Sequence, residues 1–344
     1  MRVGIPRGLL YHYYYPFWKT LFEELKAEVV VSGPTTKEVV NKGIEFSVPE
    51  ICVPMKVFTG HVEQLVKDVD YVFIPRMVSI ANKEYFCPKF MGLPDMIKYT
   101  VPGALHKILS PKIESDSDNI SNPKFYREMK DILKISSWDL NRALKKAEKA
   151  WKRVRALSKN GYVLTDALDV FEGKKNLSQE PVFKNGEITI GLMGYVYDLY
   201  DPFISMDIID KLKELNVNIL TFEMLDERQI YDSIKFMRKK LFWTFSNKLL
   251  GAGYHFYHNP RVDGIIQVTA FGCGPDSMIG KIMELESGRF AKPFMTVRID
   301  EHTGESHLQT RVEAFVDMIR RKKMVSGGVH HEGNLSLYGI NTGL

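Results

Sequence analysis

Two stretches of the chain alternate strand-like and helix-like segments, and this alternation restricts the fold more than any other feature. In the first stretch, apolar runs predict strands at residues 2–6, 27–32 and 71–75, with helical segments between them. In the second, strands are predicted at 187–193, 218–222, 263–270 and 293–299, and helices at 226–257 and 305–323. Alternation of this kind is typical of parallel sheets covered by helices. We therefore expect an α/β protein with two similar lobes.

The segment between these stretches has a different character. Residues 123–159 are rich in lysine and have helical periodicity, which predicts a helical connector or cap with its charge on the solvated face. The chain ends in a glycine-rich tail. The predicted units are a first α/β lobe at 1–110, the connector or cap at 111–185, a second α/β lobe at 186–324 and a flexible tail at 325–344.

Composition limits the class of protein. Of the 344 residues, 44% are hydrophobic and 26% are charged, as in a soluble globular protein. The net charge of +5 is not gathered into a basic block, so we expect no binding to nucleic acid. We expect no membrane segment and no signal peptide, because no apolar run is long enough to cross a bilayer. The chain has three cysteines, a small and odd number that argues against a disulfide framework. We therefore expect the protein in the reducing cytoplasm.

The three cysteines each lie in a separate turn that contains proline or glycine. Cys52 lies in ProGluIleCysValProMetLys, Cys87 in TyrPheCysProLysPheMetGly, and Cys273 in AlaPheGlyCysGlyProAspSer. A cysteine that only fills a core needs no such turn, so we predict one shared metal centre with a coordination position left open. The residue types leave three readings: zinc with a histidine as fourth ligand, an iron–sulfur cubane with three thiolates, or three unrelated buried thiols.

Three charged residues near these turns are candidate catalytic groups. Lys56 is a candidate to balance the negative charge of a cluster or to hold an acidic substrate, and Glu50 is a candidate acid–base group. Arg76 precedes the Cys87 turn and is a further candidate for charge balance or proton handling. The alternative for all three is that they are ordinary charged residues of loops.

The residues around the cysteines resemble a known family. The resemblance rests on ProGluIleCysValProMetLys, GlyHis at 60–61, ValPheIleProArg at 72–76, CysProLysPheMetGlyLeuProAsp at 87–95 and PheGlyCysGlyProAspSer at 271–277. It is to the 2-hydroxyacyl-CoA dehydratase-related family, in its CoA-substrate-specific enzyme activase-related (DUF2229-like) branch, which is kin to the double-cubane cluster proteins. The resemblance extends from the first strand to about residue 320.

The resemblance implies both a fold and a cofactor. It implies two Rossmann-like lobes with a [4Fe–4S] cluster between them, held by Cys52, Cys87 and Cys273, and it leaves open a sulfide-bridged double cubane. It also implies an ATP-hydrolysing activator of the actin/Hsp70 type as partner, a homodimer, and a small-molecule or acyl-CoA substrate. The chain itself contains no GxxxxGK[ST] motif for binding nucleotide phosphates.

From these observations we expect an oxygen-sensitive iron–sulfur protein of anaerobic metabolism that takes part in electron transfer. In this hypothesis it resembles a dehydratase component, accepts low-potential electrons from the activator, and serves in reductive or radical chemistry as a reductase or dehydratase-like component. The alternative is a non-catalytic iron–sulfur carrier, scaffold or assembly factor. The sequence does not identify the substrate.

Overall fold

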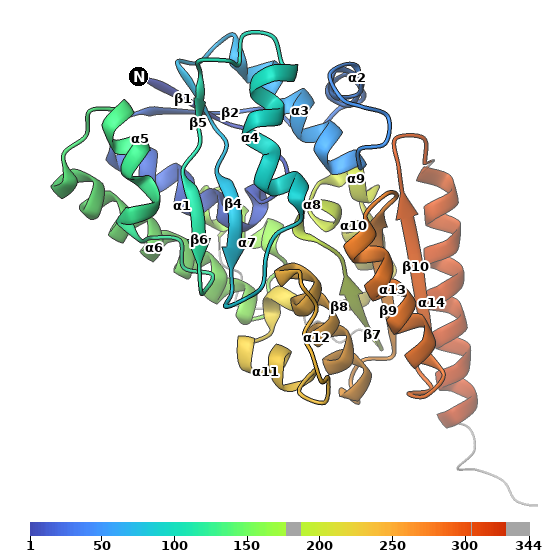
Figure 1. Ribbon diagram of the computed structural model, residues 1–344. Helices are drawn as coiled ribbons and strands as arrows, with labels where there is room; N and C mark the ends of the chain where they lie inside the picture. The colour runs from blue at the N-terminus through green and yellow to red at the C-terminus, as the bar shows by residue number, and fades with distance from the viewer. Residues whose placement is uncertain (177–186, 304, 328–344) are drawn as a thin grey trace, which may run out of the picture.

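The computed structural model describes residues 1–176, 187–303 and 305–327 and contains two four-stranded parallel sheets (Figure 1). The first sheet has the order β2-β1-β3-β5 and the second has the order β10-β9-β7-β8. In both, the first strand of the lobe lies between the second and the third, so the two lobes share one topology. The predicted α/β fold with two Rossmann-like lobes is confirmed. The strands are β1 (Arg2–Ile5), β2 (Glu28–Val31), β3 (Tyr71–Phe73), β5 (Ile108–Leu109), β7 (Ile188–Met193), β8 (Val217–Leu220), β9 (Gly264–Ala270) and β10 (Phe294–Ile299).

Seven of these eight strands form where the sequence predicts them, because they are apolar runs covered by helices, whereas the two-residue β5 was not predicted. Every residue of β7, β8 and β9 is buried, as expected for the centre of a parallel sheet. A small third sheet, which the sequence analysis did not predict, pairs β4 (Arg76–Ile80) with β6 (Lys112–Ser115) in parallel. It extends the first lobe beyond β3 toward the second lobe (Figure 1).

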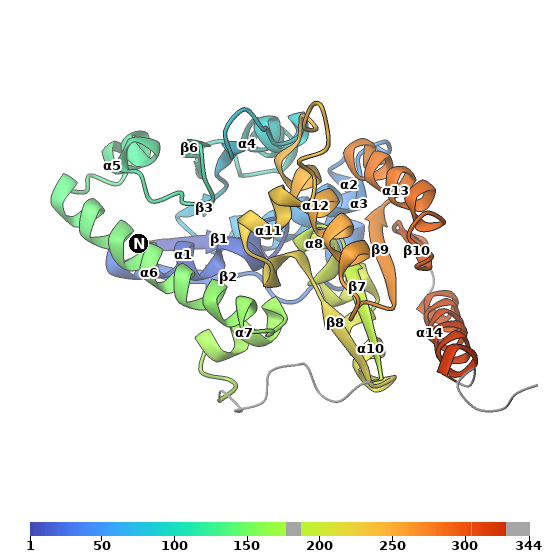
Figure 2. The same ribbon diagram turned by 90° about the horizontal axis from the view of Figure 1, so that it is seen from below.

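The helices follow the same division into two lobes and a connector. In both views, α6 runs along the first lobe beside α1, whereas α14 lies at the other end of the molecule beside β10 (Figures 1 and 2). The helices of the first lobe are α1 (Tyr11–Glu24), α2 (Lys37–Glu45), α3 (Val53–Val66) and α4 (Pro88–Thr100). The connector contains η1 (Pro123–Tyr126), α5 (Arg127–Ile132), α6 (Ser137–Lys159) and α7 (Leu164–Phe171). The second lobe contains α8 (Val196–Leu199), α9 (Pro202–Ser205), α10 (Ile208–Glu214), η2 (Phe222–Met224), α11 (Glu227–Asp232), α12 (Thr244–His258), α13 (Gly274–Ser287) and α14 (Glu305–Gly327).

One predicted helix, at 226–257, is wrong in its middle. The structure has two helices, α11 and α12, and residues 233–243 between them are not α-helical. The chain there pairs instead with the loop before Cys87: the backbone N–H of Tyr85 donates to the carbonyl of Phe242, and that of Thr244 donates to the carbonyl of Tyr85. These long-range hydrogen bonds replace the helical ones, which local periodicity does not anticipate.

Two predicted segments reach beyond the described residues. The predicted tail at 325–344 is described only to residue 327, where α14 ends, and residues 177–186 of the predicted connector are outside the description. The proposed domain boundaries therefore stay predictions. Within the described ranges, no helix is both long enough and apolar enough to cross a membrane.

Helices α2 and α3 approach each other so closely that glycine is required at the crossing. A Cβ atom on Gly43 would lie 1.8 Å from the carbonyl oxygen of Lys56, and one on Gly60 would lie 2.0 Å from that of Val39. Real Cβ atoms do not come so near to backbone, so only glycine permits this contact. The crossing fixes the position of α3, whose first turn follows Cys52.

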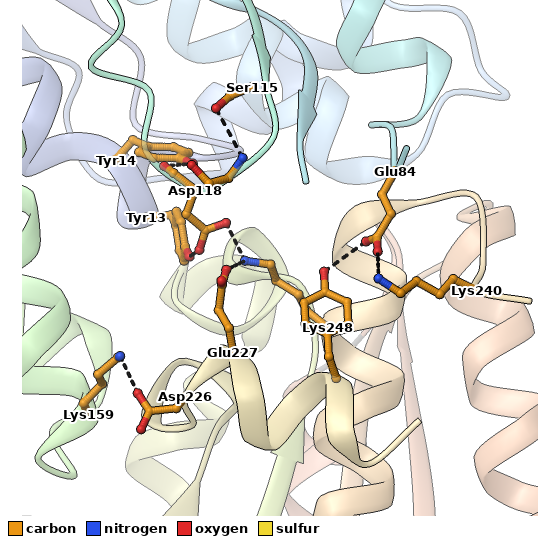
Figure 3. A network of polar contacts seen from close by, with 12 residues as sticks. Tyr13, Tyr14, Glu84, Ser115, Asp118, Lys159, Asp226, Glu227, Lys240 and Lys248 are labelled. Atoms are coloured by element: carbon orange, nitrogen blue, oxygen red, sulfur yellow. Dashed lines mark hydrogen bonds and ion pairs between the residues drawn. The ribbon is translucent and has the colours of Figure 1, made fainter. Parts of the chain in front are cut away.

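Two ion pairs, the first of them buried, join the two lobes (Figure 3). The ammonium group of Lys248, on α12, lies 2.5 Å from the carboxylate of Asp118, which follows β6. The Tyr13 hydroxyl donates to the same carboxylate at 2.5 Å. A second carboxylate, Glu84, accepts from Lys240 of the segment between α11 and α12 at 3.1 Å. These contacts hold the second lobe against α1 and the β4–β6 sheet.

Candidate functional site

The three cysteines occupy equivalent positions at the beginnings of three helices. Cys52 is the N-cap residue of α3, Cys87 that of α4 and Cys273 that of α13, and all three have extended backbone. Each helix has a proline in its first two positions, where the missing N–H is not needed. The proline-rich turns of the sequence are therefore helix starts. A helix N-terminus carries partial positive charge and favours an anionic sulfur or cluster beside it.

The cysteines come together although two belong to the first lobe and one to the second. Cys52 is close enough to interact electrostatically with both Cys87 and Cys273. Cys87 and Cys273 line one small cavity of about 30 Å³. The loops also adjoin each other, because a Cβ atom on Gly272 would lie 3.9 Å from the carbonyl oxygen of Glu50. We call the region around these three thiols the three-cysteine pocket.

Burial controls the protonation of the thiols. It raises the pKa of Cys52, Cys87 and Cys273 above the ordinary value, and the Asp276 carboxyl raises that of Cys273 further. The Lys89 ammonium group acts in the opposite direction on Cys52 and Cys87, as do backbone amides of the first helical turns. The free thiols are consequently protonated at neutral pH. Because the thiolate is the form that attacks as a nucleophile and the form that binds a metal, either role requires each thiol to lose its proton.

Two buried carboxyl groups lie beside the thiols, and the sequence analysis gave neither a role in the site. Asp198 is fully buried, and neither of its oxygens has a hydrogen-bond partner among the described residues. Burial and the nearby Asp276 and Asp201 raise its pKa well above the ordinary value, which favours the protonated form. Burial also raises the pKa of Asp276 to about 6, although one of its oxygens accepts from Gln267 at 2.8 Å. In the sequence, the only sign of these two residues was that each is an acidic residue close to a largely apolar segment.

Aromatic side chains form one wall of the pocket. Tyr195 and Tyr197 follow β7, and their ring centroids are 5.3 Å apart. Tyr197 also contacts Phe90, on the first turn of α4, at 5.9 Å between centroids. The Tyr195 hydroxyl and Ser246 share a hydrogen bond of 2.9 Å. Rings of this size limit the access of water to the thiols.

The three candidate catalytic residues lie near the pocket in the chain, but their charges are directed elsewhere. Lys56 is 3% exposed and its ammonium group lies 2.5 Å from the carboxylate of Glu301, in the loop after β10. Arg76 binds the carboxylate of Asp95 at 2.8 Å. Glu50 has an exposed side chain, and only its backbone is placed against the Cys273 loop. Their proposed catalytic role is untested and stays a prediction.

Lys89 is a cation whose charge lowers the pKa of two of the thiols. Its charge stabilises the thiolate form of both Cys52 and Cys87, and no ion pair of Lys89 is found among residues 1–176, 187–303 and 305–327. It follows Cys87 by two residues in the sequence, so proximity to that cysteine was its only signal.

The expected classification as a metal-binding iron–sulfur protein finds no support in the coordinates. In the described part of the chain, no group of three or more His, Cys, Asp and Glu side chains is placed to hold a metal ion. This disfavours the zinc reading, since a structural zinc ion needs four ligands at about 2.0–2.3 Å. It leaves the cysteines as neighbouring thiols on three helix starts.

Comparison with known proteins identifies a family for the greater part of the chain. Residues 2–225, which include Cys52 and Cys87 but not Cys273, match the family described as CoA enzyme activase uncharacterised domain (DUF2229). No curated protein matches the chain significantly. An activase acts on the activating side of such a system. The prediction of an electron-accepting dehydratase-like component, with its alternative of an iron–sulfur carrier, scaffold or assembly factor, is therefore wrong. The chain belongs to the CoA enzyme activase (DUF2229) family.

Proposed function

We propose that this chain works on the activating side of a CoA-dependent enzyme system and that the three-cysteine pocket is its working centre. The family description supports the first part, since it names an activase of CoA enzymes. The second part rests on one observation: three thiols from both lobes meet at three helix N-termini. Packing alone does not require cysteines at these positions, and the arrangement uses both lobes and all three cysteines of the chain.

The cofactor that we propose for this pocket is a [4Fe–4S] cluster bound by Cys52, Cys87 and Cys273. Such clusters are held by cysteine thiolates, each on a different iron atom, so the sulfurs need not converge on a single ion. When bound, a cluster supplies one-electron redox chemistry. The sequence alone leaves single and sulfide-bridged double cubanes open, and the iron content per chain distinguishes them.

The residues of the pocket have distinct parts in this proposal. The three helix N-termini and Lys89 offset the negative charge of the thiolates. Tyr197 and its aromatic neighbours exclude water, which otherwise weakens electrostatic interactions and promotes loss of a cluster. Asp198 is the proposed proton carrier beside Cys273, because its raised pKa favours the protonated form and neither of its oxygens is hydrogen-bonded within the described residues. Glu50, Lys56 and Arg76 stay proposed groups for proton handling and charge balance.

The proposed partner is a CoA-dependent enzyme, specifically a 2-hydroxyacyl-CoA dehydratase, the enzyme to whose family the cysteine motifs bear a resemblance. An ATP-hydrolysing activator of the actin/Hsp70 type is proposed as a second partner, as the resemblance of the cysteine motifs implies. A homodimer and a cytoplasmic location also stay proposals.

The cofactor is tested by anaerobic reconstitution of the full chain with iron and sulfide, followed by iron and sulfide analysis and electron paramagnetic resonance. We expect Cys52→Ser, Cys87→Ser and Cys273→Ser each to lose most of the iron, since every one removes a ligand. Ser287→Ala is the matched control, because Ser287 lies at the other end of α13 and its hydroxyl only donates to a carbonyl of the same helix. Wild-type protein that stays free of iron refutes the cofactor.

The activating role is tested separately by mixing the reconstituted protein with a 2-hydroxyacyl-CoA dehydratase and an activator ATPase. We expect dehydratase activity to depend on the chain and to disappear with Cys273→Ser. Dehydratase activity that is unchanged by omission of the chain refutes the role, whatever the iron content.

A further inference from the structure

A second cavity, far along the sequence from the cysteine turns, has the features of a ligand site. We name it the Arg7 cavity. It has a volume of about 430 Å³, within the range of small-molecule sites. We propose that it binds a small molecule carrying a phosphate or carboxylate group, and that Arg7 and His12 hold this oxyanion. The proposal is independent of the three-cysteine pocket.

Three parts of the chain build the cavity. Arg7 follows β1 and Ser32 follows β2, so both lie at the carboxyl edge of the first sheet, where ligands of open α/β sheets bind. Helix α7 of the connector and helix α10 of the second lobe close the opposite sides. The Arg7 backbone N–H donates to the Ser32 hydroxyl at 2.8 Å, which ties together the two strand ends.

His12 is the observation that points to a ligand. Its side chain lines the cavity and is only 3% exposed, yet neither ring nitrogen has a hydrogen-bond partner among the described residues. Burial lowers its pKa to about 3, and the Arg7 charge acts in the same direction, so the ring is neutral at physiological pH. A neutral imidazole offers one N–H donor and one acceptor. Buried polar groups are nearly always paired, so an unpaired imidazole at a cavity wall indicates a missing partner.

Arg7 supplies the positive charge for that partner. Its guanidinium lies 5.8 Å from the ring centroid of Tyr11, and in the described parts of the chain it forms no ion pair. The electrostatic effect of Arg7 on His12 places the two groups close together. A guanidinium has five N–H donors in a planar fork that matches phosphate and carboxylate. Arg7 and His12 together therefore present donors to one oxyanion.

Acidic residues also line the cavity, and lysines neutralise them. Asp166 lies 2.5 Å from Lys175 and 3.4 Å from Lys213, and Glu172 lies 2.8 Å from Lys19. These ion pairs reduce the repulsion of an anion bound at Arg7. The same carboxylates accept hydrogen bonds from hydroxyl groups, so the body of the ligand is expected to be rich in them. A sugar phosphate has this combination.

The test compares inorganic phosphate, ribose 5-phosphate, citrate and ribose as probes at constant ionic strength. Thermal unfolding and isothermal titration calorimetry of the full chain measure binding. We expect ribose 5-phosphate to bind saturably and more tightly than phosphate, and ribose not to bind. Arg7→Gln is expected to weaken binding at least about tenfold, because it removes charge-assisted hydrogen bonds. The control Arg289→Gln, on the exposed surface after α13, is expected to bind as wild type does.

A measurement on the unmodified protein complements the variants. With ¹⁵N-labelled histidine, we expect the His12 ring resonances to shift on titration with ribose 5-phosphate, and His12→Phe assigns them. The proposal is overturned when phosphate, ribose 5-phosphate and citrate all fail to bind wild type. It is also overturned when folded Arg7→Gln binds them with unchanged affinity, or when the His12 resonances do not move at saturation.

Discussion

Replacement of Lys248 by methionine tests whether the two lobes depend on one buried ion pair. The side chain of Lys248 is 3% exposed and that of Asp118 is 14% exposed, so the Lys248→Met change leaves a carboxylate in a site with little water. Removal of one partner from a buried pair typically costs about 3–5 kcal/mol. Methionine retains the apolar stem, so no cavity adds to the cost. The Tyr13 hydroxyl still donates to Asp118, which places the expected loss near the lower end, at about 3 kcal/mol.

Urea unfolding followed by tryptophan fluorescence measures this loss. Lys159→Met is the matched control, since Lys159 forms an exposed ion pair with Asp226 at the same side of the molecule and should cost under about 1 kcal/mol. The double variant Lys248→Met/Asp118→Asn is expected to recover most of the stability, because the unpaired charge is gone. A loss below about 1 kcal/mol in Lys248→Met, or a double variant as unstable as the sum of the single ones, refutes the reasoning.

The pair also predicts the response to acid. Burial on its own would raise the pKa of Asp118, but the Lys248 ammonium group and the Tyr13 hydroxyl together lower it below its ordinary value. A carboxylate with a lowered folded-state pKa stabilises the protein above its unfolded pKa of about 3.9 and loses that effect as the pH falls through the folded value. The stability difference between wild type and the double variant should therefore shrink below about pH 4.

Two further predictions concern the packing and protonation of α3. Gly60→Ala should destabilise the protein by about 3 kcal/mol in urea unfolding, because its Cβ atom would clash with the backbone of α2. The control Gly92→Ala, which has no atom within 4 Å of the added Cβ, should stabilise α4 by about 0.5–1 kcal/mol. Equal effects of the two changes would contradict the close crossing. Burial lowers the pKa of His61 to about 3, so its unfolded state binds a proton below about pH 6.5 and its folded state does not. Between pH 6.5 and 3, the His61→Gln variant should lose less unfolding free energy than wild type, by up to about 1.4 kcal/mol per pH unit. His106→Gln is the control, because His106 is exposed. Parallel plots of unfolding free energy against pH for His61→Gln and wild type would contradict this.

Local sequence patterns predicted those features that local forces determine. The apolar runs predicted every strand of the two four-stranded sheets except β5, and the glycine and proline residues around Cys273 correctly indicated a turn between β9 and the following helix. The layout of the two halves also indicated two similar lobes, which the common strand order confirms. The three turns with proline or glycine led us to expect that the cysteines share one centre. Cys52 interacts electrostatically with Cys87 and with Cys273, and their role as ligands stays a prediction.

Features that depend on distant partners were not predictable from local patterns. Lys56 was assigned to the cysteine centre because it is near in the sequence, but it pairs with Glu301, 245 positions away. Lys248 lay in a segment predicted as one helix at 226–257, and its partner Asp118 is 130 positions away. Asp198 became noticeable only through its complete burial, with no hydrogen-bond partner in the part of the chain that the structure describes. Periodicity reports which face of an element is buried, not which charge lies opposite.

The placement of the thiols has a consequence for biosynthesis. Cys273 follows Cys87 by 186 positions, so on the ribosome the nascent chain exposes two thiols long before the third has been translated. At about 5–20 residues per second, this interval lasts on the order of 10–40 s. During that time the first lobe is complete, but the pocket lacks one wall. The cluster that we propose for the three sulfurs can therefore be bound by all of them only after translation of the second lobe.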